Sequence, residues 1–266
     1  MQRLFVSLVF FISIIVSASE LPPDFDYKAT LKYSQDAISN TIGDYVLVDS
    51  NEQPFVLKRN KPFVLSLVYT SCYHTCPMTT RNLAKVVKIA REALGADSFD
   101  VITIGFDTKF DTPKTMRYFA SQQGIENINN WYYLSSDKNT IDALSKDLGF
   151  IFYPSPRGYD HIVQATVVGE NGKVYRQVYG EVFDTPLLVE PLKQLIFGQF
   201  KPNQPFLDDL ISRVRFFCTI YDPNADNYYF DYSLFIGMFI GASIVLLTIF
   251  FLFKELKKQK GIKKSK

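Results

Sequence analysis

The chain has 266 residues, with 29 lysine and arginine side chains against 27 aspartate and glutamate, three cysteines and two histidines. Setting aside Arg3 and the seven lysines and one glutamate of residues 254–266 leaves 21 basic and 26 acidic residues, so the remainder is mildly acidic. This balance argues against a nucleic acid partner, and three cysteines are too few for a small scaffold held together by disulfides.

The first 18 residues have the pattern of a secretory signal peptide. Arg3 supplies a positive charge, an apolar run too short to span a bilayer follows, and Val16, Ser17 and Ala18 fit a small-residue cleavage site. We expect cleavage after Ala18, and an uncleaved anchor is the alternative. Residues 19–41 then form an N-terminal segment.

Apolar runs that alternate with helical patterns predict a layered α/β domain over residues 42–200. We expect hairpin strands at 44–49 and 53–58, a strand at 61–69, a helix at 77–95, a strand at 100–106, a helix at 112–123, a strand at 131–135, a helix at 139–150, hairpin strands at 161–169 and 173–180, and a helix at 185–198. This order contains a thioredoxin-like core with an added N-terminal β-hairpin.

Residues 201–232 are expected to be a juxtamembrane segment. KPNQP at 201–205 marks the end of the α/β domain. Apolar residues recur at helical spacing from Leu207 to Cys218, which predicts a short amphipathic helix that packs on the domain or lies at a membrane surface.

A transmembrane helix is predicted at residues 233–253, which are uncharged for 21 residues. The lysine-rich tail 254–266 is assigned to the cytoplasm by the positive-inside rule. The sequence therefore predicts a single-pass protein of the cell inner membrane, with its main domain on the periplasmic side and its C-terminus in the cytoplasm.

The stretch SLVYTSCYHTCPMTTRNLAKVV at residues 66–87 carries the strongest chemical signal. Cys72 lies in the loop after a buried strand, and Cys76 directly precedes Pro77, a favoured first residue of a helix. We therefore expect Cys76 at the helix N-cap, where unpaired amides and the helix dipole stabilise a thiolate. Two thiolates select Cu(I), zinc or an iron–sulfur cluster, and a redox-active disulfide remains an alternative.

A metal held by two thiolates needs a third ligand, and the chain offers only two histidines. His74 lies between the cysteines, where its side chain has trouble turning onto an ion that both neighbours hold. His161 is expected to open the strand at 161–169, which in a thioredoxin-like sheet starts opposite the cysteine loop. Geometry therefore favours His161.

Three stretches, YTSCYHTCPMTTRNL, GFDTKFDTPKTMRYFA and YDHIVQATVVGENGKVY, resemble the Sco/SenC family of copper chaperones over residues 42–200. The resemblance implies a thioredoxin-like fold that binds one copper ion, as Cu(I) or Cu(II), through Cys72, Cys76 and His161. It further implies delivery of this copper to the binuclear copper centre of cytochrome c oxidase subunit II, or to another exported copper protein.

The D-x-x-x-DTP stretch contains two further acidic residues of interest. Asp107 matches an acidic residue that the family has near its metal, from where it tunes the ligands without touching the ion. Asp111, with Thr112 and Pro113, is expected to cap the helix at 112–123.

The resemblance leaves more than one function open. We expect a metallochaperone rather than an enzyme. The main alternative is a thiol–disulfide oxidoreductase that reduces the cysteines of that copper centre, or of another exported partner, with Cys72 and Cys76 as its catalytic pair and His161 dispensable. A peroxidase, and a binding module with a static disulfide, are weaker alternatives.

Overall fold

The computed structural model describes residues 25–57, 60–198 and 206–263. The predicted signal peptide at 1–18 and the KPNQP linker lie outside the described residues, as do the beginning of the N-terminal segment and the last residues of the basic tail.

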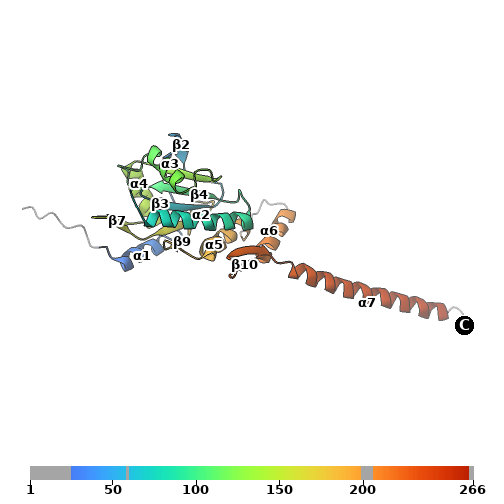
Figure 1. The fold of residues 1–266 in the computed structure, drawn as a ribbon. Coiled ribbons are helices and arrows are strands. Elements are labelled where there is room, and N and C mark those ends of the chain that lie inside the picture. The colour runs from blue at the N-terminus through green and yellow to red at the C-terminus, as the bar shows by residue number, and fades with distance from the viewer. Residues whose placement is uncertain (1–24, 58–59, 199–205, 264–266) are drawn as a thin grey trace, which may run out of the picture.

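A seven-stranded mixed sheet forms the centre of the domain, in the order β2-β1-β5-β4-β3-β8-β9 (Figure 1). Its strands are β1 Val46–Asp49, β2 Pro54–Val56, β3 Phe63–Val68, β4 Asp100–Gly105, β5 Trp131–Ser135, β8 Gln164–Val168 and β9 Val174–Tyr179. The strands β3, β4 and β5 run parallel, and β8 runs antiparallel to β3. Every residue of β3 and β4 is buried, as expected for parallel strands covered on both faces. The predicted α/β arrangement with its leading hairpin, β1–β2, is confirmed.

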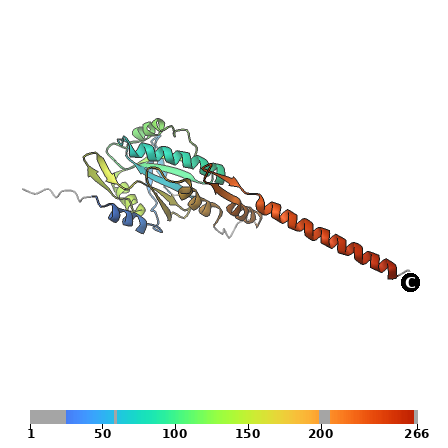
Figure 2. The same ribbon diagram turned by 60° about the horizontal axis from the view of Figure 1, so that its bottom comes forward.

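The helices of the domain are α1 Tyr27–Asp36, α2 Thr75–Leu94, α3 Pro113–Gln122, α4 Lys138–Leu148 and α5 Thr185–Phe197. The buried residues of α2 recur at helical spacing along one stripe, and α2 lies along the sheet and packs against α5 (Figures 1 and 2). Helix α1 was not predicted, because its sequence is mostly polar. Asp26 caps its start, and Ser34 donates a hydrogen bond to Gln164 of β8 at 2.8 Å.

A separate two-stranded hairpin precedes β8 and consists of β6 Phe152–Ser155 and β7 Gly158–His161. The prediction that His161 opens the long strand is therefore wrong, since His161 ends β7 and β8 begins only at Gln164. His161 pairs with Phe152 in the β6–β7 hairpin and is the last residue of β7. The next strand, β8, belongs to the main sheet and begins at Gln164.

The C-terminal part contains α6 Phe206–Cys218, β10 Thr219–Asp222, β11 Asn227–Phe230 and α7 Ser233–Lys263. Helix α6 is the predicted amphipathic helix, whereas the β10–β11 hairpin was not predicted. Within the described residues, α7 is the helix that is long and apolar enough to cross a membrane, over Ser233–Lys254. Both views show α7 leaving the domain at the end away from β6–β7 (Figures 1 and 2).

Candidate metal centre

The sheet topology brings the cysteine loop and His161 to the same end of the domain. β3 ends at Val68 and α2 begins at Thr75. The intervening residues 69–74, here called the cysteine loop, therefore lie at the carboxyl end of β3. Because β8 runs antiparallel to β3, with Ala165 opposite Ser66, the chain enters β8 from that end. Residues about 90 positions apart in the sequence therefore share one edge of the sheet.

Helix α2 begins two residues earlier than predicted, with His74 at its N-cap. The amide of Met78 donates to the carbonyl of His74 at 3.1 Å, which closes the first turn. Pro77 is tolerated at the third helical position because the amide it lacks is one that a helix start leaves unpaired. The expectation that Cys76 is the N-cap is therefore wrong, and Cys76 lies inside the first turn with its backbone amide donating to the sulfur of Cys72 at 3.3 Å.

The two thiols differ strongly in acidity. The hydrogen bond that the Cys76 thiol donates lowers the pKa of Cys72 to about 5, although burial acts in the opposite direction. The backbone amides of Cys76 and His74 and the hydroxyl of Tyr69 lower it further. The same hydrogen bond, together with burial, raises the pKa of Cys76 well above its ordinary value. At neutral pH the loop therefore holds a Cys72 thiolate beside a Cys76 thiol.

His161 presents a neutral imidazole at this edge. Its Nδ1 lies 3.0 Å from the carbonyl oxygen of Ile162. Because a carbonyl can only accept, Nδ1 carries the hydrogen and Nε2 keeps its lone pair. Burial lowers the pKa of His161, and its ring lies 6.2, 5.5 and 5.3 Å from the rings of Tyr69, Phe106 and Phe150. An aromatic cluster thus holds a metal-competent nitrogen.

The three predicted ligands are neighbours but do not form a closed site. Cys72 and Cys76 are in direct contact. Burial lowers the pKa of His161, and the hydrogen bond with Ile162 and the charge of Cys72 act in the opposite direction. In the part of the chain that the structure describes, no three or more His, Cys, Asp or Glu side chains are grouped closely enough to hold a metal ion. His74 is exposed in the loop. The three-ligand set therefore stays a prediction.

Asp107 is buried just after the end of β4, where it lines a cavity of about 590 Å³ together with Phe106 and Tyr159. Burial raises the pKa of Tyr159, and the charge and hydrogen bond of Asp107 raise it further. The ring of Tyr159 in turn lies 5.3 Å from that of Tyr69, whose hydroxyl bonds Cys72. Asp107 is thus connected to the thiolate through two tyrosines.

Asp111 ties together two loops of the site. One carboxylate oxygen accepts from the amide and hydroxyl of Thr70 at 2.8 and 2.7 Å, and the other accepts from the amide of Asp107 at 2.8 Å. The prediction that Asp111 caps α3 is wrong, because Thr112 is the N-cap. Burial raises the pKa of Asp111 to about 6, although these hydrogen bonds oppose the shift.

Sequence reasoning missed three residues that shape the site. Tyr69 bonds Cys72, Tyr159 bonds Asp107, and Glu181 accepts a hydrogen bond from Thr75 at 2.8 Å, which ties the loop after β9 to the start of α2. A signal existed for Tyr159, since it lies two residues before His161 and thus on the same face of a strand. Nothing local marks Glu181.

The model of the SCO1/SenC family matches residues 34–196. No curated protein sequence matched. Among solved structures, a protein of Aquifex aeolicus VF5 described as an electron transfer protein is 28% identical, with a TM-score of 0.54 over 62% of this chain and 97% of its own.

Two more distant structures show the same thioredoxin-like fold. BsSco, described as a member of the Sco family of cytochrome c oxidase assembly proteins with a disulfide switch, is 19% identical, with a TM-score of 0.51 over 59% of this chain and 94% of its own. Yeast Sco1 with copper bound is 14% identical, with a TM-score of 0.52 over 62% of this chain and 92% of its own. At these identities the likeness establishes the fold.

Proposed function

Because this chain belongs to the SCO1/SenC family, we propose that it is a membrane-anchored copper chaperone for the assembly of cytochrome c oxidase. It holds one copper ion, as Cu(I) or Cu(II), through Cys72, Cys76 and His161, and delivers it to the binuclear copper centre of oxidase subunit II. The relatives support this proposal, since yeast Sco1 carries copper and BsSco is described as an oxidase assembly protein.

One observation carries the proposal: a Cys72 thiolate lies in contact with Cys76, beside the neutral imidazole of His161. Two sulfurs and one nitrogen suit copper, and a site with few ligands suits transfer by ligand exchange. Because Cys76 keeps its proton in the free protein, binding releases that proton and breaks the hydrogen bond to Cys72.

The proposed location is the periplasmic side of the cell inner membrane, with α7 as a single span and the C-terminus in the cytoplasm. The apolar stretch Ser233–Lys254 supports the span. The seven lysines of residues 254–266 and the signal pattern of residues 1–18 support its direction.

Copper binding to the reduced full chain in detergent tests the ligand set. We expect one copper per chain, with two sulfur ligands and one nitrogen ligand in the X-ray absorption spectrum. Substitution of Cys72, Cys76 or His161 by alanine should each reduce the affinity strongly. His74→Ala is the matched control, since this histidine is exposed in the same loop. A His161→Ala variant that binds Cu(I) and Cu(II) like the wild type would contradict the assignment.

A second candidate function is reduction of a partner's disulfide. The low pKa of Cys72 and the buried, protonated Cys76 favour it, because the first can attack a disulfide and the second can resolve the mixed disulfide. A Cys76→Ser variant that traps subunit II as a mixed disulfide, in cells where His161→Ala keeps full oxidase activity, would support this function. Loss of oxidase activity in His161→Ala would support copper delivery.

A further inference from the structure

Residues 206–230, here called the C-terminal segment, pack onto the domain. Helix α6 packs on α5, and β11 packs on α2. Cys218 and Tyr228 are buried although they lie outside the α/β domain. The segment is therefore a docked part of the folded protein and not a loose tether.

A buried lysine holds one side of this contact. Lys193 of α5 is only 8% exposed, and its ammonium donates to the carbonyl oxygen of Thr219 at 2.6 Å and lies 5.4 Å from the centre of the Phe216 ring. Nearby, the hydroxyl of Tyr228 donates to Glu190 at 2.9 Å. A buried ammonium is costly without its partners, so these contacts select one docked position.

The turn of the β10–β11 hairpin is held at the middle of α2. Asp226 in this turn forms an ion pair with Lys85 at 2.5 Å and accepts from the hydroxyl of Tyr221 at 2.9 Å. Phe230, at the other end of β11, borders a cavity of about 330 Å³ that Gly95 also lines. Strand β11 therefore runs along α2 toward its C-terminal end.

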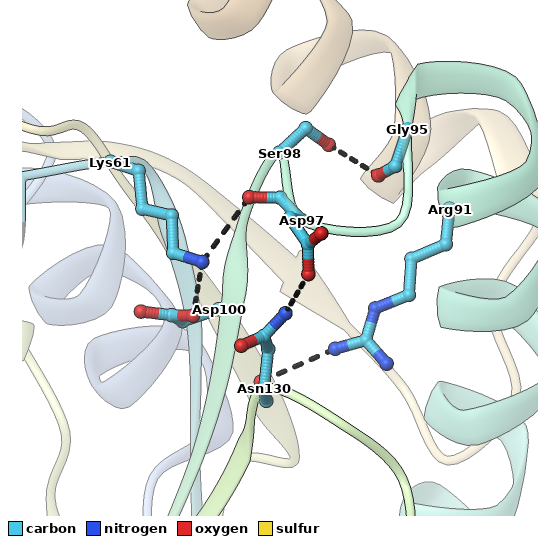
Figure 3. Close-up of polar contacts among 7 residues, drawn as sticks. All are labelled: Lys61, Arg91, Gly95, Asp97, Ser98, Asp100 and Asn130. Carbon is cyan, nitrogen blue, oxygen red and sulfur yellow. Dashed lines mark hydrogen bonds and ion pairs between the residues drawn. The ribbon is translucent and has the colours of Figure 1, made fainter.

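Polar contacts brace the C-terminal end of α2 (Figure 3). Arg91, in the last turn of α2, donates to the carbonyl oxygen of Asn130 at 3.2 Å, and the Asn130 amide donates to Asp97 at 2.7 Å. Lys61 pairs with the fully buried Asp100 at 2.9 Å and donates to the carbonyl oxygen of Asp97 at 3.2 Å. These contacts join the end of α2 to the starts of β4 and β5.

The candidate metal centre lies at the opposite end of α2. Cys76 is in the first turn of this helix, whereas the C-terminal segment departs near its last turn. A helix of 20 residues is about 30 Å long. Helix α7 leaves from this far end in both views (Figures 1 and 2).

We propose that the docked C-terminal segment holds the domain in one orientation on the membrane, with the cysteine loop on the side turned away from the bilayer. The partner that exchanges copper there is then a water-soluble exported domain that reaches the loop from the aqueous side, and not a group at the lipid surface. This inference rests on the proposed anchoring through α7.

Energy transfer from the domain to the lipid surface tests this orientation. The full chain is inserted into phosphatidylcholine vesicles that carry an energy acceptor on the lipid headgroups, with a fluorescent amino acid at position 73 or 229. Tyr73 is 98% exposed in the cysteine loop, and Tyr229 is 51% exposed on β11. We expect strong loss of donor emission at position 229 and little at position 73. Equal loss at both positions, in vesicles that carry the chain on flotation, would overturn the proposal.

Variants test whether docking causes the orientation. Lys193→Met combined with Asp226→Asn removes both the hydrogen bond from Lys193 to Thr219 and the ion pair between Asp226 and Lys85. Lys85→Ala removes only the exposed ion pair and leaves the core unchanged. We expect the loss of emission at position 73 to increase in the double variant and, to a smaller extent, in Lys85→Ala. Lys138→Ala is the matched control, because it breaks an exposed ion pair with Asp142 on α4. Emission at position 73 that is unchanged in both docking variants would overturn the proposal.

Copper binding separates this inference from the proposed function. Variants that keep wild-type copper binding have a folded domain, since the centre lies at the other end of α2. A wild-type chain that binds no copper but shows the expected emission pattern would contradict the proposed copper function and still support the proposed orientation.

Discussion

At the scale of single residues, the chemistry of the site depends on Cys72. Its sulfur accepts hydrogen bonds from the Cys76 thiol, from the amides of Cys76 and His74, and from the hydroxyl of Tyr69. Each donor favours the charged form of the thiol, and together they outweigh burial. The result is a preformed thiolate, which is the form of cysteine that binds metals and attacks disulfides.

The reactivity of the two thiols should therefore differ. We expect iodoacetamide to modify Cys72 well before Cys76 at pH 7, with a rate that rises around pH 5 and then levels. Cys76→Ala removes the largest cause of the shift, so it should move this rise to higher pH. Peptide mapping by mass spectrometry on the reduced, copper-free chain measures both. Equal rates at Cys72 and Cys76 would contradict the assignment.

The buried Asp111 should make stability depend on pH. Its pKa is raised to about 6, so the protonated form is favoured in the folded state. Its contribution to stability is therefore fully present below its ordinary pKa and is lost as the pH rises through about 6. The stability advantage of the wild type over Asp111→Asn should shrink by on the order of 2 kcal/mol between pH 4 and 7, measured by chemical denaturation.

A second aspartate supplies the control for this experiment. The exposed Asp137, which caps α4, has a pKa lowered chiefly by its hydrogen bond from Thr140. Its contribution should instead grow as the pH rises from acid, so Asp137→Asn should show the opposite trend. The same trend for both variants would contradict the role given to Asp111.

At the scale of elements, the β6–β7 hairpin positions half of the site. Tyr159 and His161 lie two residues apart on β7, and their rings share contacts with Tyr69 and Phe106. Gly158 allows this approach, because its backbone adopts φ +121° and a Cβ would lie 2.8 Å from the Tyr69 hydroxyl. The hairpin thereby couples the imidazole to the hydroxyl that bonds Cys72.

Gly158→Ala should disturb copper binding through Tyr69. The backbone strain should cost about 1–3 kcal/mol of stability, and displacement of the Tyr69 hydroxyl should raise the pKa of Cys72 and weaken copper binding. Gly95→Ala is the matched control, since Gly95 has φ +109° but its nearest neighbour, Ser98, lies at the other end of α2. Copper titration and thermal unfolding of both variants measure the effects. Equal copper affinities would exclude this role for the hairpin.

At the scale of the whole molecule, the candidate metal centre and the apolar helix α7 lie toward opposite ends of α2. The cysteine loop precedes the first turn of α2. The C-terminal segment contacts the last turn of α2, and Asp97 and Asn130 are hydrogen-bonded just beyond that turn. The segment therefore contributes to the stability of the domain without touching the candidate centre.

Truncation should separate the effect of the C-terminal segment on stability from copper binding at the candidate centre. A chain of residues 25–198 exposes Lys193 and the surface that buries Tyr228, whereas residues 25–232 keep both contacts. We expect the thermal midpoint of the shorter chain to be lower by on the order of 5 °C, with the same copper affinity. Calorimetry and copper titration of the two chains provide the test, and equal midpoints would show that the segment is not docked.

The α/β arrangement, the cysteine loop and the apolar C-terminal helix could all be predicted from the sequence alone. These features follow from local patterns. The buried strands β3 and β4 are continuous apolar runs in the sequence, and the buried face of α2 consists of apolar residues at helical spacing. Cys72 and Cys76 are in contact for the same reason, since they lie only four residues apart at the start of α2.

Which distant side chains and strands contact one another became clear only from the three-dimensional structure. Strands as short as β7 and β10 have too few residues to show a period, so both small hairpins escaped prediction. The role of Asp111 as a tie between loops, and the contact of Lys193 with Thr219, depend on groups that meet only after the sheet and helices have packed. Hydrogen bonds and pKa shifts at this site arise because groups lie close together in space. Their separation along the chain does not show which groups will be close.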